Sequence, residues 1–212
     1  MITCDKMKKA DAYAINSIKV PSIVLMENAA IGFVNALNFE NYNNIGIICG
    51  VGNNGGDGLA IARQLVIKNK NVSVYIVGNI EKSTIDFNIN LEILKNLSIP
   101  IKFISNKSEL SDSLDSLKKC DLYIDGIFGI GLTREVDGIF YDTIEFMNSQ
   151  NTPIYSIDIP SGLNGDTGNP MGISVKANHT VTFHKMKVGL ADASDYTGKI
   201  SIAHIGVPEN IY

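Results

Sequence analysis

Residues 45–66 read IGIICGVGNNGGDGLAIARQLV. The apolar run at 45–49 predicts a short buried strand, and the apolar spacing at 59–66 predicts a helix. Between them, residues 50–58 contain five glycines in nine positions. A strand that runs into a glycine-rich turn and then a helix is the unit from which parallel α/β sheets are built. This stretch therefore decides the fold class.

The same alternation continues to the end of the chain. Short apolar strands alternating with helices indicate a mostly parallel sheet covered on both faces. We predict an α/β, three-layer, Rossmann-like fold in which residues 1–212 form one domain. Two amphipathic helices, 5–18 and 23–37, are expected to pack on its side or to serve association. Further strands are expected at 72–77, 101–104, 121–125, 153–158, 179–183 and 199–205, with helices at 86–97, 109–118 and 141–148.

The composition of the chain narrows the range of functions that the protein could have. Apolar residues make up 45% and charged residues 19% of the chain, values typical of a folded globular protein. The net charge of −4 argues against a nucleic-acid partner, which requires a basic face. The three cysteines have no metal-site spacing and are expected to be reduced. No apolar run reaches the roughly 18 residues of a membrane span, so we expect a cytoplasmic protein without a membrane partner.

Three loops at the expected carboxyl edge of the sheet are unusual. In 50–58, the glycines allow positive φ angles, and the N-terminus of the next helix suits phosphate. The simpler alternative is a turn in which Asp57 or Asn54 caps the helix. In 125–134, DGIFGIGLTR, a strand-ending Asp125 precedes Arg134, a residue suited to phosphate oxygens. The alternative here is a flexible loop with a solvated arginine.

The third loop, DIPSGLNGDTG at 158–168, also begins with a carboxylate at the end of a strand. Its acids can alternatively cap tight turns. Taken together, Asp125 and Asp158 should point into one crevice beside the asparagine-rich loop. Polar groups that converge at such an edge are the usual sign of a ligand site in this class of sheet.

At these loops the sequence resembles the NAD(P)H-hydrate epimerase family, the YjeF N-terminal-type domain. The resembling segments are GNNGGDG at 52–58, DGIFGIGL at 125–132 and DIPSGLNGDTG at 158–168, with IVLMENA at 23–29, TVTF at 180–183 and KVGL at 187–190. They span essentially the whole chain in the family order. The resemblance implies epimerisation of the R and S forms of hydrated NADH and NADPH, a homodimer, and one potassium ion per subunit. It also implies fusion to, or action with, an NAD(P)H-hydrate dehydratase.

Carried over by position, the resemblance assigns substrate contacts and potassium ligands. Mostly neutral oxygen donors with one carboxylate suit a large monovalent cation. We expect the side chain of Glu135 to add an unfavourable charge, so its backbone is the better contact. The potassium ligands are Asn54, Asp125 and Ser161. The substrate contacts are Asn53, Asn54, Gly55, Gly56, Asp57, Gly129, Ile130, Gly131, Leu132, Thr133, Arg134, Glu135 and Asp158.

Epimerisation requires the hydroxyl at C6 of the reduced ring to leave, or the ring to open, before return on the opposite face. Either route needs proton transfer and stabilisation of a transient cation, and Asp158 is the predicted acid/base. Lys187 is expected to be a solvated lysine and only secondarily a second acid/base.

Two other readings remain. A non-catalytic ligand- or protein-binding module of the same fold should lack an acid or the asparagine loop, and this chain keeps both. A Rossmann dehydrogenase usually carries an acid at the end of its second strand. Here that strand ends YIVGN at 75–79, without one.

Overall fold

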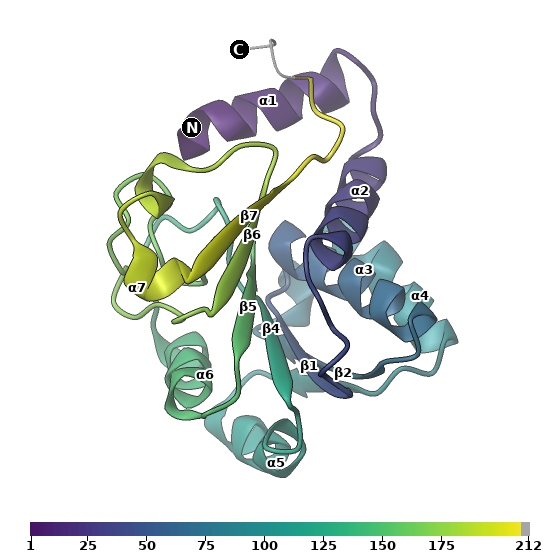
Figure 1. Ribbon diagram of the computed structural model, residues 1–212. Coiled ribbons are helices and arrows are strands. Elements are labelled where there is room, and N and C mark those ends of the chain that lie inside the picture. Colours follow the sequence, from purple (N-terminus) through teal and green to yellow (C-terminus); the bar gives the residue numbers. More distant parts are fainter. Residues whose placement is uncertain (209–212) are drawn as a thin grey trace.

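The computed structural model describes residues 1–208, which contain one seven-stranded sheet (Figure 1). The strand order is β3-β2-β1-β4-β5-β6-β7, and every neighbouring pair is parallel. The prediction of a mostly parallel sheet is confirmed. The strands are β1 (Asn44–Cys49), β2 (Asn71–Val77), β3 (Ile101–Ile104), β4 (Leu122–Gly126), β5 (Ile154–Ile157), β6 (His179–Phe183) and β7 (Lys199–Ala203).

Helices cover both faces of this sheet, as predicted for a three-layer fold. In Figure 1, α2, α3 and α4 lie on one side and α5 and α6 on the other, while α1 lies beyond one end of the strands. The helices are α1 (Cys4–Asn16), α2 (Ser22–Asn35), α3 (Asn53–Ile67), α4 (Ile85–Asn96), α5 (Lys107–Leu117), α6 (Gly138–Ser149) and α7 (Ser194–Thr197), with 3-10 turns η1 (Ile80–Lys82) and η2 (Val188–Leu190).

The core is split by the sheet into two layers. Successive side chains of a strand point to opposite faces. Accordingly, β1 places Ile45 and Ile47 in the cluster beneath α2, α3 and α4, and Ile48 in the cluster beneath α5 and α6. In β2, Val74 and Tyr75 divide in the same way. Because both faces are buried, these strands are apolar at nearly every position, which is why they could be recognised in the sequence.

Helix α3 begins at Asn53, six residues before the predicted start, so six of the nine residues of the glycine-rich stretch are helical. The five glycines of this stretch allow positive φ angles, but none of them has one. Their role is close packing. A Cβ on Gly55 would lie 1.8 Å from the carbonyl oxygen of Gly50, and one on Gly58 would lie 2.6 Å from the sulfur of Cys49. Glycine therefore lets the first turns of α3 lie directly against the end of β1.

The N-terminus is tied to the last third of the chain. Ile2 forms a parallel bridge with Lys187, its N–H donates to the carbonyl of Met186 at 2.9 Å, and the N–H of Val188 donates to its carbonyl at 3.1 Å. The N–H of Cys4 donates to Asp166 at 2.7 Å. These bonds hold α1 across one end of the sheet, whereas α2 packs beside α3.

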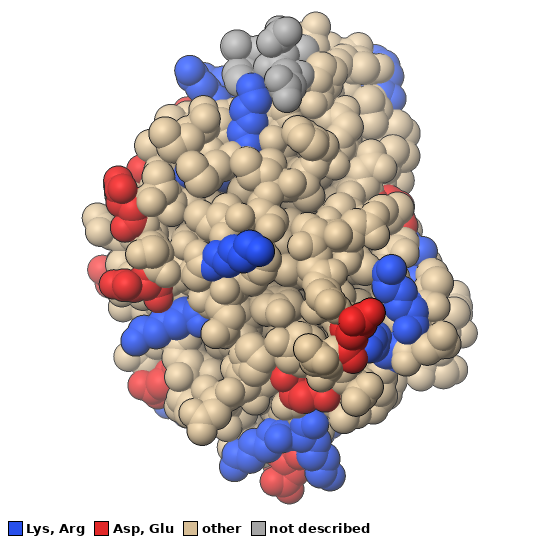
Figure 2. Space-filling view, viewed as in Figure 1, with Lys and Arg blue, Asp and Glu red and all other residues tan. Residues whose placement is uncertain are grey.

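The surface in Figure 2 carries basic and acidic side chains scattered among each other, without a continuous basic area on this face. All three cysteines are free. Among residues 1–208, no helix combines the length and the apolar character needed to cross a bilayer.

The packing of α3 gives a direct test. Gly55→Ala should lower the free energy of unfolding by about 3 kcal/mol, the upper end for overpacking, because the clash is with backbone that cannot move cheaply. Gly52→Ala is the matched control. A Cβ there meets nothing within 4 Å, and the backbone is extended, so the cost should stay within about 1 kcal/mol. Urea unfolding measures both, and equal losses would contradict the packing role.

Candidate active site

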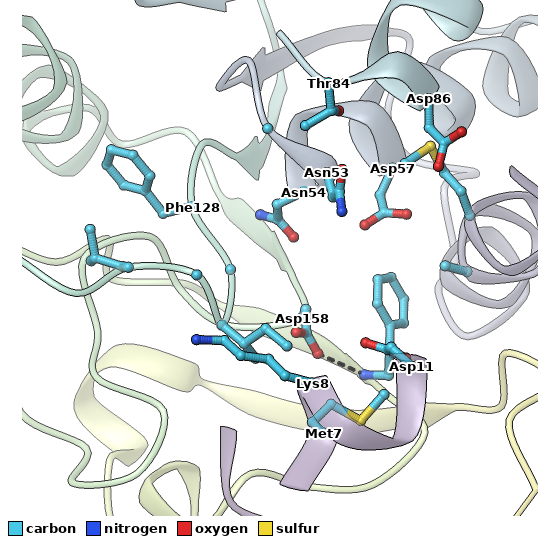
Figure 3. Close-up of a pocket in the computed structure, with 18 of the residues that line it drawn as sticks. Met7, Lys8, Asp11, Asn53, Asn54, Asp57, Thr84, Asp86, Phe128 and Asp158 are labelled. Carbon is cyan, nitrogen blue, oxygen red and sulfur yellow. Dashed lines mark hydrogen bonds between the residues drawn. The ribbon is translucent and has the colours of Figure 1, made fainter. Parts of the chain in front are cut away.

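A pocket of about 670 Å³ opens at the carboxyl ends of β1, β4 and β5, where the direction of chain connection reverses (Figure 3). Its volume lies in the range of small-molecule sites, and its position is the usual ligand crevice of an open parallel sheet. Its walls include α1, α2, the turn into α3, the start of α4, residues 127–134, Asp158 after β5, and Lys187 after β6.

Most of the predicted substrate contacts line this pocket, and five other predicted residues do not. The lining residues are Asn53, Asn54, Asp57, Gly129, Ile130, Gly131, Leu132, Thr133, Arg134 and Asp158. Gly55 and Gly56 are buried in the packing of α3, and Glu135 is exposed outside the lining. Asp125 and Ser161 are fully buried and lie behind the pocket wall.

Asp158 is held firmly at the pocket wall. It follows the last residue of β5 and has a φ angle of 63°, which turns the chain sharply out of the sheet. Its Oδ1 accepts hydrogen bonds from the backbone N–H of Phe183 at 3.0 Å and the hydroxyl of Thr182 at 3.1 Å, and it pairs with the ammonium of Lys187. These donors all use Oδ1, and the residue itself lines the pocket.

The expectation that Lys187 is solvated is wrong. Its side chain is fully buried, and its ammonium donates to Asp158, to the hydroxyl of Thr182 at 3.1 Å and to the carbonyl of Phe183 at 2.9 Å. All three N–H groups are thus used, which is how a buried ammonium is stabilised. The sequence around Lys187 does not reveal this burial, because the segment is bridged by Ile2, from the other end of the chain.

Asp125 was expected to face the crevice, and instead its carboxylate is directed into the protein. It accepts from the hydroxyl of Ser156 and from the N–H of Ser161, both at 2.8 Å, and also from the hydroxyl of Ser161. The N–H of Phe128 in turn donates to the hydroxyl of Ser161 at 2.8 Å. Burial raises the pKa of Asp125, and the bonds from Ser161, Ser156 and Ile127 oppose that shift. This network joins the two loops that follow β4 and β5.

Asn54 lies against the same network, with oxygen atoms that glycine leaves uncovered. A Cβ on Gly129 would lie 3.1 Å from Oδ1 of Asn54, and a Cβ on Gly126 would lie 3.1 Å from its backbone oxygen. The amide nitrogen of Asn54 is buried without a hydrogen-bond partner. Residues 1–208 offer no group of three or more His, Cys, Asp or Glu placed to hold a metal ion. The oxygens of Asn54, Asp125 and Ser161, mostly neutral, fit the chemistry of a monovalent cation.

Helix α1 contributes side chains that the sequence analysis missed. Met7, Lys8 and Asp11 line the pocket, and Figure 3 shows them facing Asn53, Asn54 and Asp57 of α3 from the opposite side. A signal was present: Asp11 lies four residues after the buried Met7 and three before the buried Ala14, within the apolar stripe of the helix. A carboxylate in such a stripe is unusual and marks a polar site.

Two pocket carboxyl groups have raised pKa values. For Asp11, desolvation and then the charge of Asp158 raise the pKa to about 6, against a smaller lowering by Lys187. For Asp57, which is partly exposed to the pocket, burial raises the pKa well above its usual value, and the charges of Asp158, Asp11 and Asp86 add to this. Strong shifts of this kind in a cleft are typical of functional sites.

A sequence profile of the family described as "YjeF-related protein N-terminus" matches residues 22–189, which is most of the chain. The chain belongs to this family. Similar YjeF-related proteins include the NAD(P)H-hydrate epimerase of Oenococcus oeni, 40% identical over 205 residues, which cover 94% of this chain and 93% of that one. The NAD(P)H-hydrate epimerase of Anaerococcus prevotii is 40% identical over 203 residues, covering 96% and 93%.

Two further similarities concern domain arrangement and fold. The bifunctional NAD(P)H-hydrate repair enzyme Nnr of Dictyoglomus turgidum is 38% identical over 220 residues, which cover this whole chain and 41% of that protein. The crystal structure of the yeast protein ynu0 superimposes with a TM-score of 0.80 over 95% of this chain and 86% of that chain. At 22% identity, that likeness shows a shared fold.

The buried ion pair predicts a stability effect. Lys187→Met should lower the free energy of unfolding by about 3–5 kcal/mol, because the charge of Asp158 is left without a counter-charge. The double variant Lys187→Met/Asp158→Asn should recover most of the loss, since the asparagine oxygen still accepts from Thr182 and Phe183. Chemical denaturation of the four proteins of this cycle measures the coupling. Additive losses would show that the two side chains do not depend on each other.

Proposed function

We propose that this protein is an NAD(P)H-hydrate epimerase, which interconverts the R and S forms of hydrated NADH and NADPH. Membership of the family supports the proposal, as do relatives of that name that match nearly the full length of the chain. The observation that links this family to its chemistry is the setting of Asp158. One of its oxygens is held by Lys187, Thr182 and Phe183, and the residue lines the pocket at the carboxyl edge of the sheet.

The dinucleotide has two parts with different requirements. Its phosphates suit the start of α3, where Gly52 at the N-cap supplies no side-chain bond, so the first N–H groups can bind an anion. Arg134 lies at the rim, with only a 3.4 Å contact to Asp137 on an exposed surface, and it is free to turn toward a phosphate. The hydrated nicotinamide ring then belongs near Asp158, at the deeper and more polar end.

The reaction at the ring is an exchange of one hydroxyl between two faces of C6. A proton must reach the departing hydroxyl so that it leaves as water, and the ring nitrogen then carries a positive charge shared with C6. A water returning on the other face must lose a proton. Asp158 is our acid/base for these transfers, and its negative charge also stabilises the transient cation.

We also propose a potassium site formed by Asn54, Asp125 and Ser161. Asp125 and Ser161 are hydrogen-bonded to each other, and glycines 126 and 129 leave room beside the oxygens of Asn54. A bound potassium ion would supply a fixed positive charge behind the pocket wall. That charge would also favour the ionised form of Asp125, whose pKa burial otherwise raises.

Two proposals concern partners. The bifunctional repair enzyme from Dictyoglomus turgidum supports joint action with an enzyme such as an NAD(P)H-hydrate dehydratase that consumes one epimer. A homodimer is the expected assembly. Val24 and Ile31 of α2 and Ile202 of β7 are exposed aliphatic residues on two elements in contact with each other. Light scattering of the purified chain measures the assembly directly.

The catalytic proposal is tested by incubating the purified R-epimer of hydrated NADH with the protein and following the S-epimer by chromatography. The wild type should bring the epimers to equilibrium. Asp158→Asn should reduce kcat by roughly 10²- to 10⁴-fold, the usual contribution of a general acid or base. Asp192→Asn, at an exposed position, is the control. A wild-type protein that binds the hydrate without interconverting it would support the non-catalytic module instead.

The potassium proposal has its own measurement. Epimerase activity should rise with potassium chloride above its value in choline chloride at equal ionic strength, which removes general screening effects. Asn54→Ala should raise the potassium concentration needed for half-activation at least ~10-fold, in line with losses seen when metal-site groups are removed. Identical activity in both salts would exclude a functional potassium ion.

A further inference from the structure

Asp11 is a pocket residue whose carboxyl group lacks a hydrogen-bond donor that a buried carboxyl oxygen normally has. Its Oδ1 is buried and has no hydrogen-bond partner, although the residue lines the pocket. A buried acceptor left unsatisfied is unfavourable, and it is satisfied either by a proton on the carboxyl group or by a donor on a ligand. Nothing in the packing of α1 requires a carboxylate here, because its neighbours in the stripe, Met7 and Ala14, are apolar.

Charged side chains from several elements of the chain surround Asp11. Asp158 and Lys187 face it from the sheet, Asp57 faces it from α3 with Asp86 of α4 behind, and Lys8 lies on its own helix. In Figure 3, Asp11 and Asp158 come from different walls and extend toward the same space, with Asp57 across from Asp11. These carboxyl groups do not form a metal-holding cluster among the described residues. Their shared space is therefore available to an organic group.

We propose that Asp11 is the second acid/base residue of the epimerase, acting together with Asp158 from a different element of the pocket wall. The inference rests on the proposed function. Inversion at one carbon requires the hydroxyl to leave from one face and water to enter at the other. This involves two proton transfers, one to the departing hydroxyl and one from the entering water, and two carboxyl groups in the same pocket can divide them.

Each step balances in atoms and charge. Asp11 in its acid form gives its proton to the C6 hydroxyl as the C6–O bond breaks, and the bonding electron pair leaves with the oxygen as water. The lone pair of the ring nitrogen forms a C=N bond. Water then adds to C6 from the other face, and Asp158 accepts its proton. One water leaves and one enters, with no oxidant or reductant. One proton has then passed from Asp11 to Asp158, and exchange with solvent water restores both residues before the next forward reaction, whereas the reverse reaction carries the proton back to Asp11.

The titration of Asp11 supports its role as the proton donor, with Asp158 as the proton acceptor. Desolvation and the charge of Asp158 raise its pKa to about 6. Below that pH Asp11 carries the proton that the reaction needs, and above it the proton is lost. Activity that depends on this proton should therefore fall as the pH rises through about 6.

The raised pKa of Asp11 also predicts whether its ionised form stabilises or destabilises the fold. The pKa of Asp11 is higher in the folded chain than the ordinary value of 3.8. Its ionised form therefore destabilises the fold at pH values above about 6, and this effect is absent below the unfolded pKa. Asp11→Asn should consequently melt at a higher temperature than the wild type at neutral pH. The variant should nevertheless lose activity, because a functional side chain is often kept at a cost to the stability of the fold.

The experiment compares the wild type, Asp11→Asn and Asp5→Asn, the last an exposed aspartate on the first turn of the same helix. Each full-length protein is assayed with the R-epimer of hydrated NADH on both sides of pH 6, and its melting temperature is measured. Asp11→Asn should lose about 10²-fold or more in kcat with KM nearly unchanged, and its residual activity should no longer fall as the pH rises. Asp5→Asn should match the wild type in all three respects.

Each other outcome decides against the proposal. An inactive wild type overturns the proposed function, and this inference with it. An active wild type with a fully active Asp11→Asn overturns the inference alone, as does a change confined to KM, which would make Asp11 a binding residue. A melting temperature of Asp11→Asn below that of the wild type would mean that the carboxylate is structural.

Discussion

The buried ion pair between Lys187 and Asp158 is the interaction on which the site depends. Removing both charges from water is unfavourable unless each is fully hydrogen-bonded. Here Lys187 uses all three N–H groups, and Oδ1 of Asp158 accepts from three donors. The pair therefore fixes the orientation of the carboxylate to a degree that an exposed pair would not. It also fixes the segment after β6, which is the segment that Ile2 pairs with.

The three acids of this region show how one site gives similar side chains different properties. Asp158 has a cation and hydrogen-bond donors, Asp125 has hydroxyl and N–H donors and no access to the pocket, and Asp11 has an oxygen without a partner. Their environments therefore differ in desolvation, nearby charge and hydrogen bonding. Acid/base chemistry in one pocket requires carboxyl groups in different environments.

Much of the fold could be predicted from the sequence, because strands buried on both faces are apolar at nearly every position and helices between them have regular spacing. The start of α3 could not. Glycine is a poor helix former, so residues 53–58 were expected to form a loop, and the gain from packing α3 onto β1 outweighs that local preference. The three motif loops supply a large part of the pocket wall, and the place of Asp11 in the apolar stripe of α1 was a further signal. The inward direction of Asp125, the burial of Lys187 and the position of α1 beside the pocket depend on contacts between distant segments, which spacing alone does not encode.

The bonds of the N-terminus have a consequence for biosynthesis. Helix α1 precedes the other described elements along the chain, yet it is bonded to residues made much later: Cys4 and Asp166 are 162 residues apart, and Met186 and Val188 lie further on. Contacts between such distant segments close late, because a long loop must be ordered first. During translation the apolar stripe of α1 therefore stays exposed while β1 to β6 are made. The pocket gains this wall only after the segment that follows β6 has been synthesised.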